Sequence, residues 1–407
     1  MAGKSKVTEE LLSKFSLMPK EAVMEIANRE GKLFIGVPKE SSFQENRVAL
    51  IPEAVAVLVN HGHHVVVESK AGEGSHIYDT DYSEAGAEIV YSREEVFKAS
   101  IILKCAPLKE EELQMLHMNQ VVISPIHLPT LSNEQLKKII DRKITAIAFE
   151  YIKDEADTFP IVRSMSEIAG NASIMVASEY LSNLRDGKGI LLGGITGVPP
   201  ASVVILGAGT VGEYAARTAL GLGAEVKIFD NSIYKLKRLQ NHLGTRVYTS
   251  IIRQDILQKA LQHADVAIGA MHSKLGRTPL IVTEHMVSNM KAGSVIIDVS
   301  IDQGGCFETS EITSHEKPFF KKFDVIHYCV PNIPSRVPRT ASLAISNVLT
   351  PILLETHQLG GLDKMLQTSM PTRNGVYVYK GYLTNKHLSE KFDLKFTDLE
   401  LIFTSSY

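Results

Sequence analysis

The chain has 407 residues, enough for two or three domains, because a single hydrophobic core stops growing well below that length. Its apolar content of 44%, charged content of 22% and net charge of −3 do not favour nucleic-acid or membrane partners. Apolar runs stay well short of the roughly 20 residues that cross a bilayer, and the first residues lack a signal-peptide core. Three cysteines without metal-ligand spacing indicate a reducing compartment, so we expect a cytoplasmic protein without a bound metal.

In chain order, residues 1–32 have the character of an N-terminal extension with one or two short amphipathic helices. Strands and helices then alternate, which is typical of parallel sheets. The first series of predicted strands is Leu33–Val37, His64–Glu68, Ile101–Lys104, Val121–Ser124 and Thr145–Ala148. After a predicted helix over Ser166–Leu184 comes the second series: Val203–Leu206, Glu225–Phe229, Arg246–Tyr248, Asp265–Ala270, Ser294–Val299 and Val325–Tyr328.

The second series holds six strands in about 130 residues, the content of one doubly wound nucleotide-binding domain. We therefore predict an α/β fold of Rossmann type for this part of the chain. The run Lys317–Phe323 is interpreted as a solvated amphipathic turn, and a helix over Thr340–Leu354 should lead away from the second sheet, back to the first domain.

The most specific motif is a strand that runs into G-x-G-x-x-G, made of Gly207, Ala208, Gly209, Thr210, Val211 and Gly212. The first glycine permits a tight turn, the second lets the backbone approach a pyrophosphate, and the third lets helix pack on strand. The helix that begins there directs N–H groups and the positive end of its dipole at the phosphates. Asp230 ends the next strand, 23 residues after the first glycine. Its carboxylate would accept the ribose hydroxyls and repel a 2′-phosphate, so the motif predicts NAD.

Several further motifs are similar to those of the alanine dehydrogenase and transhydrogenase alpha-subunit family. They are Gly36–Glu40, Glu45–Leu50 with Pro52, Ala71–Ser75, Met165–Gly170 and Ile301–Glu308. The resemblance runs from about Leu33 to about Glu355, and its last motif looks more like alanine dehydrogenase than the transhydrogenase subunit. It implies two doubly wound Rossmann-like domains with a deep cleft between them. Residues 33–162 and 339–407 would form the substrate domain, and residues 163–338 the NAD-binding domain.

Two residues of the first series suit the chemistry of a small amino acid. The guanidinium of Arg47 matches a carboxylate bidentately, although most arginines are simply solvated, and the resemblance places this one in the substrate pocket. His127 lies just past a predicted parallel strand, at the end where such sheets bind ligands. An imidazole can give and take protons near neutral pH, and the family match makes His127 the catalytic histidine.

One position departs from the enzyme pattern. Alanine dehydrogenases usually carry a Lys-x-Lys-Glu-Pro run at the end of the strand predicted here as Ile101–Lys104, and its second lysine binds the substrate. This chain instead has Lys104-Cys105-Ala106-Pro107-Leu108. Either Ala106 replaces that lysine, or one residue is deleted and Lys104 takes over substrate binding. Transhydrogenase subunits also lack the second lysine.

In the second series, Asp302 follows an apolar strand and would orient the substrate amine or the attacking water, with a turn-forming acid as the alternative. Asp298, four residues earlier, is interpreted as structural. The resemblance adds Ser166, Lys235 and Asn332 to the cofactor site. Lys235 is equally well explained as a solvated helix charge.

The leading functional hypothesis is NAD-dependent oxidative deamination of L-alanine to pyruvate and ammonia. One alternative is a relative that acts on another amino or 2-oxo acid, and the other is an NAD(H)-binding module like the transhydrogenase alpha subunit. The alanine dehydrogenases that the chain resembles are commonly hexamers, so we expect a homo-oligomer.

Overall fold

The computed structural model describes residues 32–405 apart from 129–130, 184–186 and 274–275. The chain divides into two compact units, one of residues 1–161 and 342–407 and one of residues 162–341. The amphipathic helices expected before residue 32 lie outside the described residues. Helix α8 (Pro160–Leu181) and helix α13 (Pro338–Gln358) contain the two points where the chain passes from one unit to the other.

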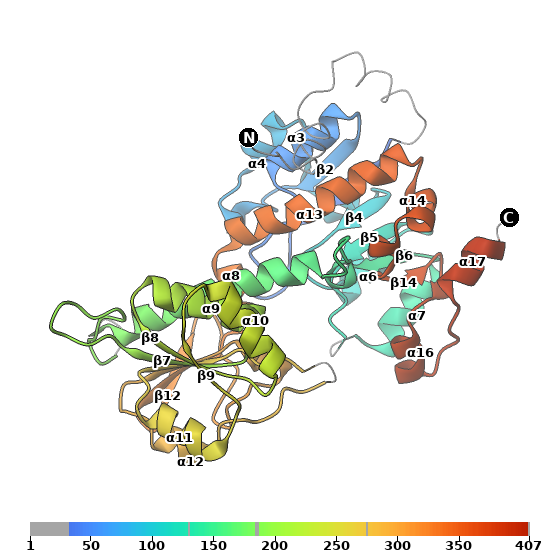
Figure 1. The fold of residues 1–407 in the computed structure, drawn as a ribbon. Coiled ribbons are helices and arrows are strands. Elements are labelled where there is room, and N and C mark those ends of the chain that lie inside the picture. Colours follow the sequence, from blue (N-terminus) through green and yellow to red (C-terminus); the bar gives the residue numbers. More distant parts are fainter. Residues whose placement is uncertain (1–31, 129–130, 184–186, 274–275, 406–407) are drawn as a thin grey trace, which may run out of the picture. The chain divides into compact units, whose positions relative to one another are not determined.

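The described residues of the first unit form an eight-stranded sheet in the order β15-β14-β6-β5-β4-β1-β2-β3 (Figure 1). Its strands are β1 (Phe34–Val37), β2 (His64–Glu68), β3 (Glu88–Val90), β4 (Ile101–Leu103), β5 (Val121–Ser124), β6 (Thr145–Ala148), β14 (Val376–Tyr379) and β15 (Tyr382–Leu383). The strands from β1 to β6 are parallel in the doubly wound order 3-2-1-4-5-6, and β14 and β15 extend this sheet antiparallel.

Helices of the first unit connect these strands. They are α3 (Pro52–Asn60), α4 (Asp79–Glu84), α5 (Arg93–Val96), α6 (Glu110–Met115), α7 (Asn133–Asp141), α14 (Leu362–Thr368), α15 (Met370–Arg373), α16 (Lys386–Phe392) and α17 (Leu399–Ser405), with 3-10 turns η1 (Glu73–Ser75) and η2 (Phe149–Tyr151). Helix α13 packs on the loop after β1, because Ser342 Oγ accepts the Val48 N–H at 2.9 Å and Ser346 Oγ accepts the Ile51 N–H at 3.2 Å.

The second unit holds a seven-stranded sheet, as far as it is described, in the order β12-β13-β11-β10-β7-β8-β9. Its strands are β7 (Ser202–Leu206), β8 (Glu225–Phe229), β9 (Tyr248–Ser250), β10 (Val266–Gly269), β11 (Val295–Asp298), β12 (Phe319–Lys322) and β13 (Val325–Tyr328). Its helices are α9 (Thr210–Gly221), α10 (Ile233–Leu243), α11 (Gln254–Gln262) and α12 (Glu284–Ser288), with 3-10 turns η4 (Val299–Gln303) and η5 (Ile333–Arg336). The parallel strands again follow the order 3-2-1-4-5-6.

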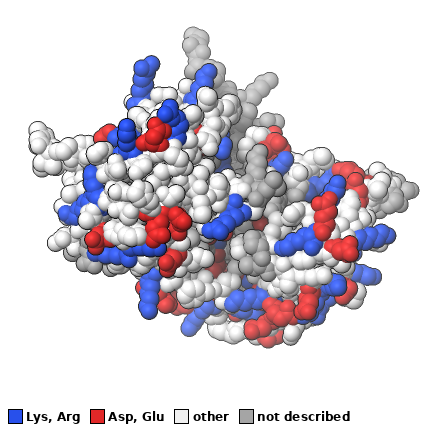
Figure 2. Space-filling view, turned by 90° about the horizontal axis from the view of Figure 1, so that it is seen from below, with Lys and Arg blue, Asp and Glu red and all other residues white. Residues whose placement is uncertain are grey.

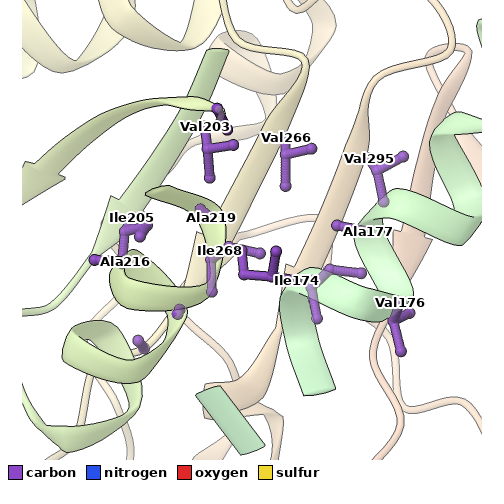
Figure 3. Close-up of a cluster of buried hydrophobic side chains, with 14 of the residues drawn as sticks. Ile174, Val176, Ala177, Val203, Ile205, Ala216, Ala219, Val266, Ile268 and Val295 are labelled. Carbon is purple, nitrogen blue, oxygen red and sulfur yellow. The ribbon is translucent and has the colours of Figure 1, made fainter. Parts of the chain in front are cut away.

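The core of the second unit explains why its helices lie where they do. Figure 3 shows Ile174 and Ala177 of α8 and Ala216 and Ala219 of α9 beside branched side chains of β7, β10 and β11. Small residues let the two helices approach closely. A Cβ atom on Gly170 of α8 would lie 2.5 Å from the Val211 carbonyl oxygen of α9. The predicted fold class, two doubly wound sheets, is confirmed.

The interpretation of residues 317–323 as a solvated turn is wrong. Phe319–Lys322 forms β12, which pairs antiparallel with β13 at the edge of the sheet. The ring of Phe319 packs edge-on against Tyr180 of α8 at 5.2 Å, and Phe320 stacks on His327 at 4.8 Å. Lys317, Lys321 and Phe323 of this run are exposed, whereas Phe319 and Phe320 are half-buried, which is the pattern of an edge strand as much as of a turn.

The molecular surface carries both signs of charge. On the face drawn in Figure 2, basic and acidic side chains are intermixed and no continuous region of one sign covers it. No helix within the described ranges is long and apolar enough to cross a membrane. Within the same ranges there is no group of three or more histidine, cysteine, aspartate or glutamate side chains that could hold a metal ion.

Candidate active site

The glycine turn of the second unit links β7 to α9, and its three glycines differ in what surrounds them. Gly207 has a φ of 110°, and a Cβ there would lie 2.3 Å from the Ala270 carbonyl oxygen. A Cβ on Gly212 would lie 1.9 Å from the Gly207 carbonyl oxygen, so helix and turn touch at this point. A Cβ on Gly209 would meet nothing within 4 Å. The turn therefore needs Gly207 and Gly212 for its own packing, whereas Gly209 leaves open space in front of the helix N-terminus.

Asp230 directly follows β8 and is bonded to this turn. Its side chain is almost fully buried, and Oδ2 accepts the Ala208 N–H at 2.8 Å while Oδ1 accepts the Ser232 N–H at 2.7 Å. The Lys235 ammonium lies 4.0 Å from Oδ2. Arg238, on the same helix, donates weakly from Nη2 to the Ala208 carbonyl oxygen at 3.4 Å. The carboxylate is thus held in place at the carboxyl end of the strand, with two basic residues near it.

The other predicted cofactor and catalytic residues of this unit occupy the following places. Thr210 and Val211 open helix α9, Ser166 lies in helix α8, and Asn332 precedes η5 with a left-handed φ of 54° after β13. Asp302 is exposed in η4, which begins directly after β11. Because the strands are parallel, the glycine turn, Asp230, Asp302 and Asn332 all follow the carboxyl ends of strands in one sheet, where open α/β sheets bind ligands.

Asp298 behaves as the sequence predicts for a structural acid. Its side chain is fully buried, and its oxygens accept the Ser300 N–H at 3.1 Å, the Cys306 N–H at 3.0 Å and the Ser310 hydroxyl at 2.7 Å. Burial raises the pKa of this carboxyl, and the hydrogen bonds oppose the rise. The residue organises the loop that carries Asp302.

In the first unit, Arg47 follows β1 and is paired with a glutamate two residues before it. The Arg47 Nε and Nη2 atoms donate to the two carboxylate oxygens of Glu45 at 2.7 and 2.5 Å, and both side chains are nearly buried, with 11% and 5% exposed. Burial alone would lower the pKa of the Arg47 guanidinium, but Glu45 raises it above its usual value. The arginine is therefore charged and held in one orientation.

Lys104 directly follows β4, and only 1% of its side chain is exposed. Its ammonium donates to Glu40 Oε2 at 2.7 Å and to Glu112 Oε1 at 2.9 Å. Burial would lower the pKa of Lys104, but the two carboxylates raise it. Glu40 Oε1 accepts the Cys105 N–H at 2.5 Å, so the pair also fixes the turn where the second lysine of the family pattern is missing.

His127 is exposed just past β5, with a left-handed φ of 43°. It lines a cavity of about 490 Å³ together with Pro107, Leu108, Ser124, Gln135 and Tyr377, all from the first unit. Since β1, β4 and β5 are adjacent in the sheet, Arg47, Lys104 and His127 follow the carboxyl ends of three neighbouring strands. All three residues that the sequence singled out in this unit thus lie on the carboxyl side of one sheet, although the cavity that His127 lines includes neither Arg47 nor Lys104.

Sequence reasoning missed the partners of these residues. Glu40 and Glu45 lie in motifs of the family resemblance, but nothing in the sequence marks them as partners of Lys104 and Arg47, and Glu112 lies in no motif. Arg238 had a local signal as well, since it lies three residues after Lys235 and so shares its helix face.

Two family models match this chain, one in each half. Residues 36–169 match the model described as "Alanine dehydrogenase/PNT, N-terminal domain", and residues 173–386 match "Alanine dehydrogenase/PNT, C-terminal domain". The chain belongs to the alanine dehydrogenase/PNT family. This is a family of dinucleotide-binding oxidoreductases, so the resemblance seen in the motifs is confirmed.

Individual relatives of this family match over most of the chain. The protein named alanine dehydrogenase 2 of Staphylococcus aureus (strain USA300) is 40% identical over 369 residues, which are 90% of this chain and 98% of the relative. A solved structure of an L-alanine dehydrogenase is 37% identical with a TM-score of 0.83, covering 88% of this chain and 99% of that one. A transhydrogenase from Sinorhizobium meliloti is 25% identical with a TM-score of 0.74, covering 87% and 99%.

Proposed function

We propose that this chain is an NAD-dependent alanine dehydrogenase, which converts L-alanine, water and NAD⁺ into pyruvate, ammonium, NADH and a proton. One observation carries the proposal: the chain aligns over 90% of its length with relatives named alanine dehydrogenase. The position of Arg47 and His127 at the carboxyl edge of one sheet agrees with it. In this proposal residues 33–162 and 339–407 are the substrate domain, and residues 163–338 bind the cofactor.

We propose NAD as the cofactor rather than NADP. The glycine turn offers open space at Gly209 for a pyrophosphate, which supports a dinucleotide. The buried carboxylate of Asp230 at the end of β8 suits the two ribose hydroxyls and repels a 2′-phosphate. Ser166, Lys235 and Asn332 complete the proposed set. When bound, NAD⁺ would supply the hydride acceptor.

The remaining chemistry falls to side chains of this chain. Arg47 would hold the substrate carboxylate, because a charged guanidinium already fixed by Glu45 loses little freedom on binding. His127 would move protons as the amine becomes an imine and water adds to the carbon. Asp302 would orient the amine or the attacking water. The prediction that Lys104 also contacts the substrate stays a prediction. We also propose that the enzyme is a homo-oligomer in the cytoplasm.

The test follows NADH absorbance with purified enzyme, L-alanine and either NAD⁺ or NADP⁺. We expect turnover with NAD⁺ and a clear preference over NADP⁺, and the Asp230→Ala variant should narrow that preference. The His127→Ala variant should keep its affinity for NADH while kcat falls about 10²–10⁴-fold, the usual range for a lost general acid–base.

Other outcomes point to the alternative functions. Tight NADH binding without alanine turnover, but with turnover of a larger amino acid, would mean a different substrate, as Ala106 in place of the family's lysine allows. NADH binding without turnover of any amino acid would favour a transhydrogenase-like binding module, the class of one of the structures that the chain resembles.

A further inference from the structure

Glu150 lies beside the histidine turn, although the mechanism above does not use it. Strands β5 and β6 pair in parallel with Ser124 opposite Ala148. Glu150, two residues beyond that pair in η2, therefore stands next to Ile126, two residues beyond it on the other chain segment. The Glu150 Oε1 atom accepts the Ile126 N–H at 2.8 Å. This hydrogen bond joins the ends of the two strands one residue before His127.

Pro125 and Ile126 lead from β5 into this turn. Pro125 has no N–H to donate, and the Ile126 side chain is 4% exposed, fixed in the core of the first unit. His127 then adopts a left-handed φ of 43°, a conformation that strains a non-glycine residue and persists only where its surroundings impose it. The hydrogen bond to Glu150 is a local contact that can impose it.

The carboxyl group of Glu150 is itself in an unfavourable place. Burial raises its pKa, and the N–H groups of Ile126 and His127 oppose the rise. The neighbouring Tyr377, which lines the same cavity as His127, also has a raised pKa, first through burial and then through the charge of Glu150. Burying a carboxyl costs free energy unless the carboxyl accepts hydrogen bonds. For Glu150 these come from backbone N–H groups, including those of Ile126 and His127.

We propose that Glu150 is a positioning residue for His127: its carboxyl oxygen fixes the 125–127 turn and so aims the imidazole for proton transfer. This inference rests on the proposed role of His127. Proton transfer needs heavy atoms within hydrogen-bond reach, and a misplacement of about 1 Å can cost roughly 10²-fold in rate. Loss of the contact should therefore lower kcat far more than it changes the binding of either ligand.

Two substitutions separate contact from charge. Glu150→Gln keeps an acceptor oxygen at the same reach and removes the charge, whereas Glu150→Asp keeps the charge and withdraws the oxygen by one methylene. We expect kcat of Glu150→Gln within about threefold of wild type, and kcat of Glu150→Asp about 10–100-fold lower. The KM for alanine and the Kd for NADH should stay within about twofold in both. Equal losses in the two variants, or wild-type kcat in Glu150→Asp, would overturn the proposal.

A matched control lies at the opposite end of the same strand. Gln120 is buried before β5 and donates from Nε2 to the carbonyl oxygens of Phe97 and Ala99 at 2.5 and 2.7 Å. Gln120→Ala should lower the unfolding temperature without lowering the kcat of the folded enzyme. A loss of kcat in this control equal to that of Glu150→Asp would show that any weakening of β5 is enough, and the proposal would fail.

A readout without substrate keeps this test apart from the proposed function. In ¹⁵N-histidine-labelled protein, the imidazole signals of His127, assigned with His127→Gln, should move in Glu150→Asp and stay in Glu150→Gln. Movement in this pattern together with no alanine turnover by wild type would reject the activity and leave the positioning role standing. Unmoved signals in Glu150→Asp would reject the positioning role whatever the activity.

Discussion

Individual charged residues of the first unit are paired in ways that their spacing in the chain hides. Arg47 and Lys104 both stood out as groups for a substrate carboxylate, and each proves to be bonded to buried glutamates of its own unit. Sequence could predict which strand ends carry them, because strand ends follow from local patterns. It could not predict Glu40 or Glu112 as partners of Lys104, because these contacts form only once the strands are side by side.

The Lys104 pair leads to a prediction about stability. Lys104→Ala would leave Glu40 buried without its cation and Glu112 with only the Arg93 Nη1 atom at 3.5 Å, and breaking a buried ion pair typically costs about 3–5 kcal/mol of unfolding free energy. We expect a large fall in the midpoint of denaturant unfolding, and none in Lys98→Ala, whose side chain is exposed on the preceding segment. If Lys104 instead binds substrate, Lys104→Ala will unfold near wild type but show a KM for alanine raised about tenfold or more.

At the scale of secondary-structure elements, local and non-local signals account for what was predicted. The strands β1, β2, β5, β6, β8 and β13 were located within a residue of their ends, and the glycine turn was recognised because its signal lies in six consecutive positions. Strand β3 (Glu88–Val90) is three residues long and too short to show a period. Strand β12 was missed because a short amphipathic run forms a strand only where another strand pairs with it. Here that partner is β13.

The glycine turn provides a matched pair of variants. Gly212→Ala would place a Cβ 1.9 Å from a backbone oxygen, so we expect a loss of about 1–3 kcal/mol of stability or more. Gly209→Ala meets nothing within 4 Å and has an ordinary φ of −79°, so its unfolding should match wild type. Because the open space at Gly209 is the proposed pyrophosphate position, its NADH Kd should rise about tenfold or more, equal to about 1.4 kcal/mol. Wild-type NADH affinity in Gly209→Ala, measured by titration, would place the cofactor elsewhere.

For the whole molecule, buried histidines predict how stability responds to acid. His63 of the first unit and His327 of the second are buried, and burial lowers the pKa of each to about 4. Unfolded histidine titrates near 6.5, so as pH falls from about 6.5 to about 4 the unfolded chain binds protons that the folded chain does not. Stability should therefore fall over this window by up to about 1.4 kcal/mol per pH unit for each histidine.

The measurement is the unfolding free energy of wild type and variants at several pH values in that window. His327→Gln should reduce the slope of unfolding free energy against pH by the contribution of one histidine. His285→Gln, which changes an exposed side chain, should leave this slope unchanged. An identical slope in His327→Gln and wild type would mean that His327 binds its proton over the same pH range in the folded and the unfolded chain, against the lowered pKa.

The division of the chain into 34–161, 162–341 and 342–405 bears on the order in which the protein folds during synthesis. The second unit is continuous, so all of its sheet has left the ribosome once Ala341 has emerged. The first unit begins earlier but finishes last, because β14 must still be translated before it can cover the open edge of β6, more than 200 residues upstream. Until then β6 presents unpaired backbone groups to neighbouring nascent chains. The first unit is thus the first to be translated but the last to complete its sheet. The second unit, inserted within it, is the part that a folding intermediate on the ribosome would contain complete.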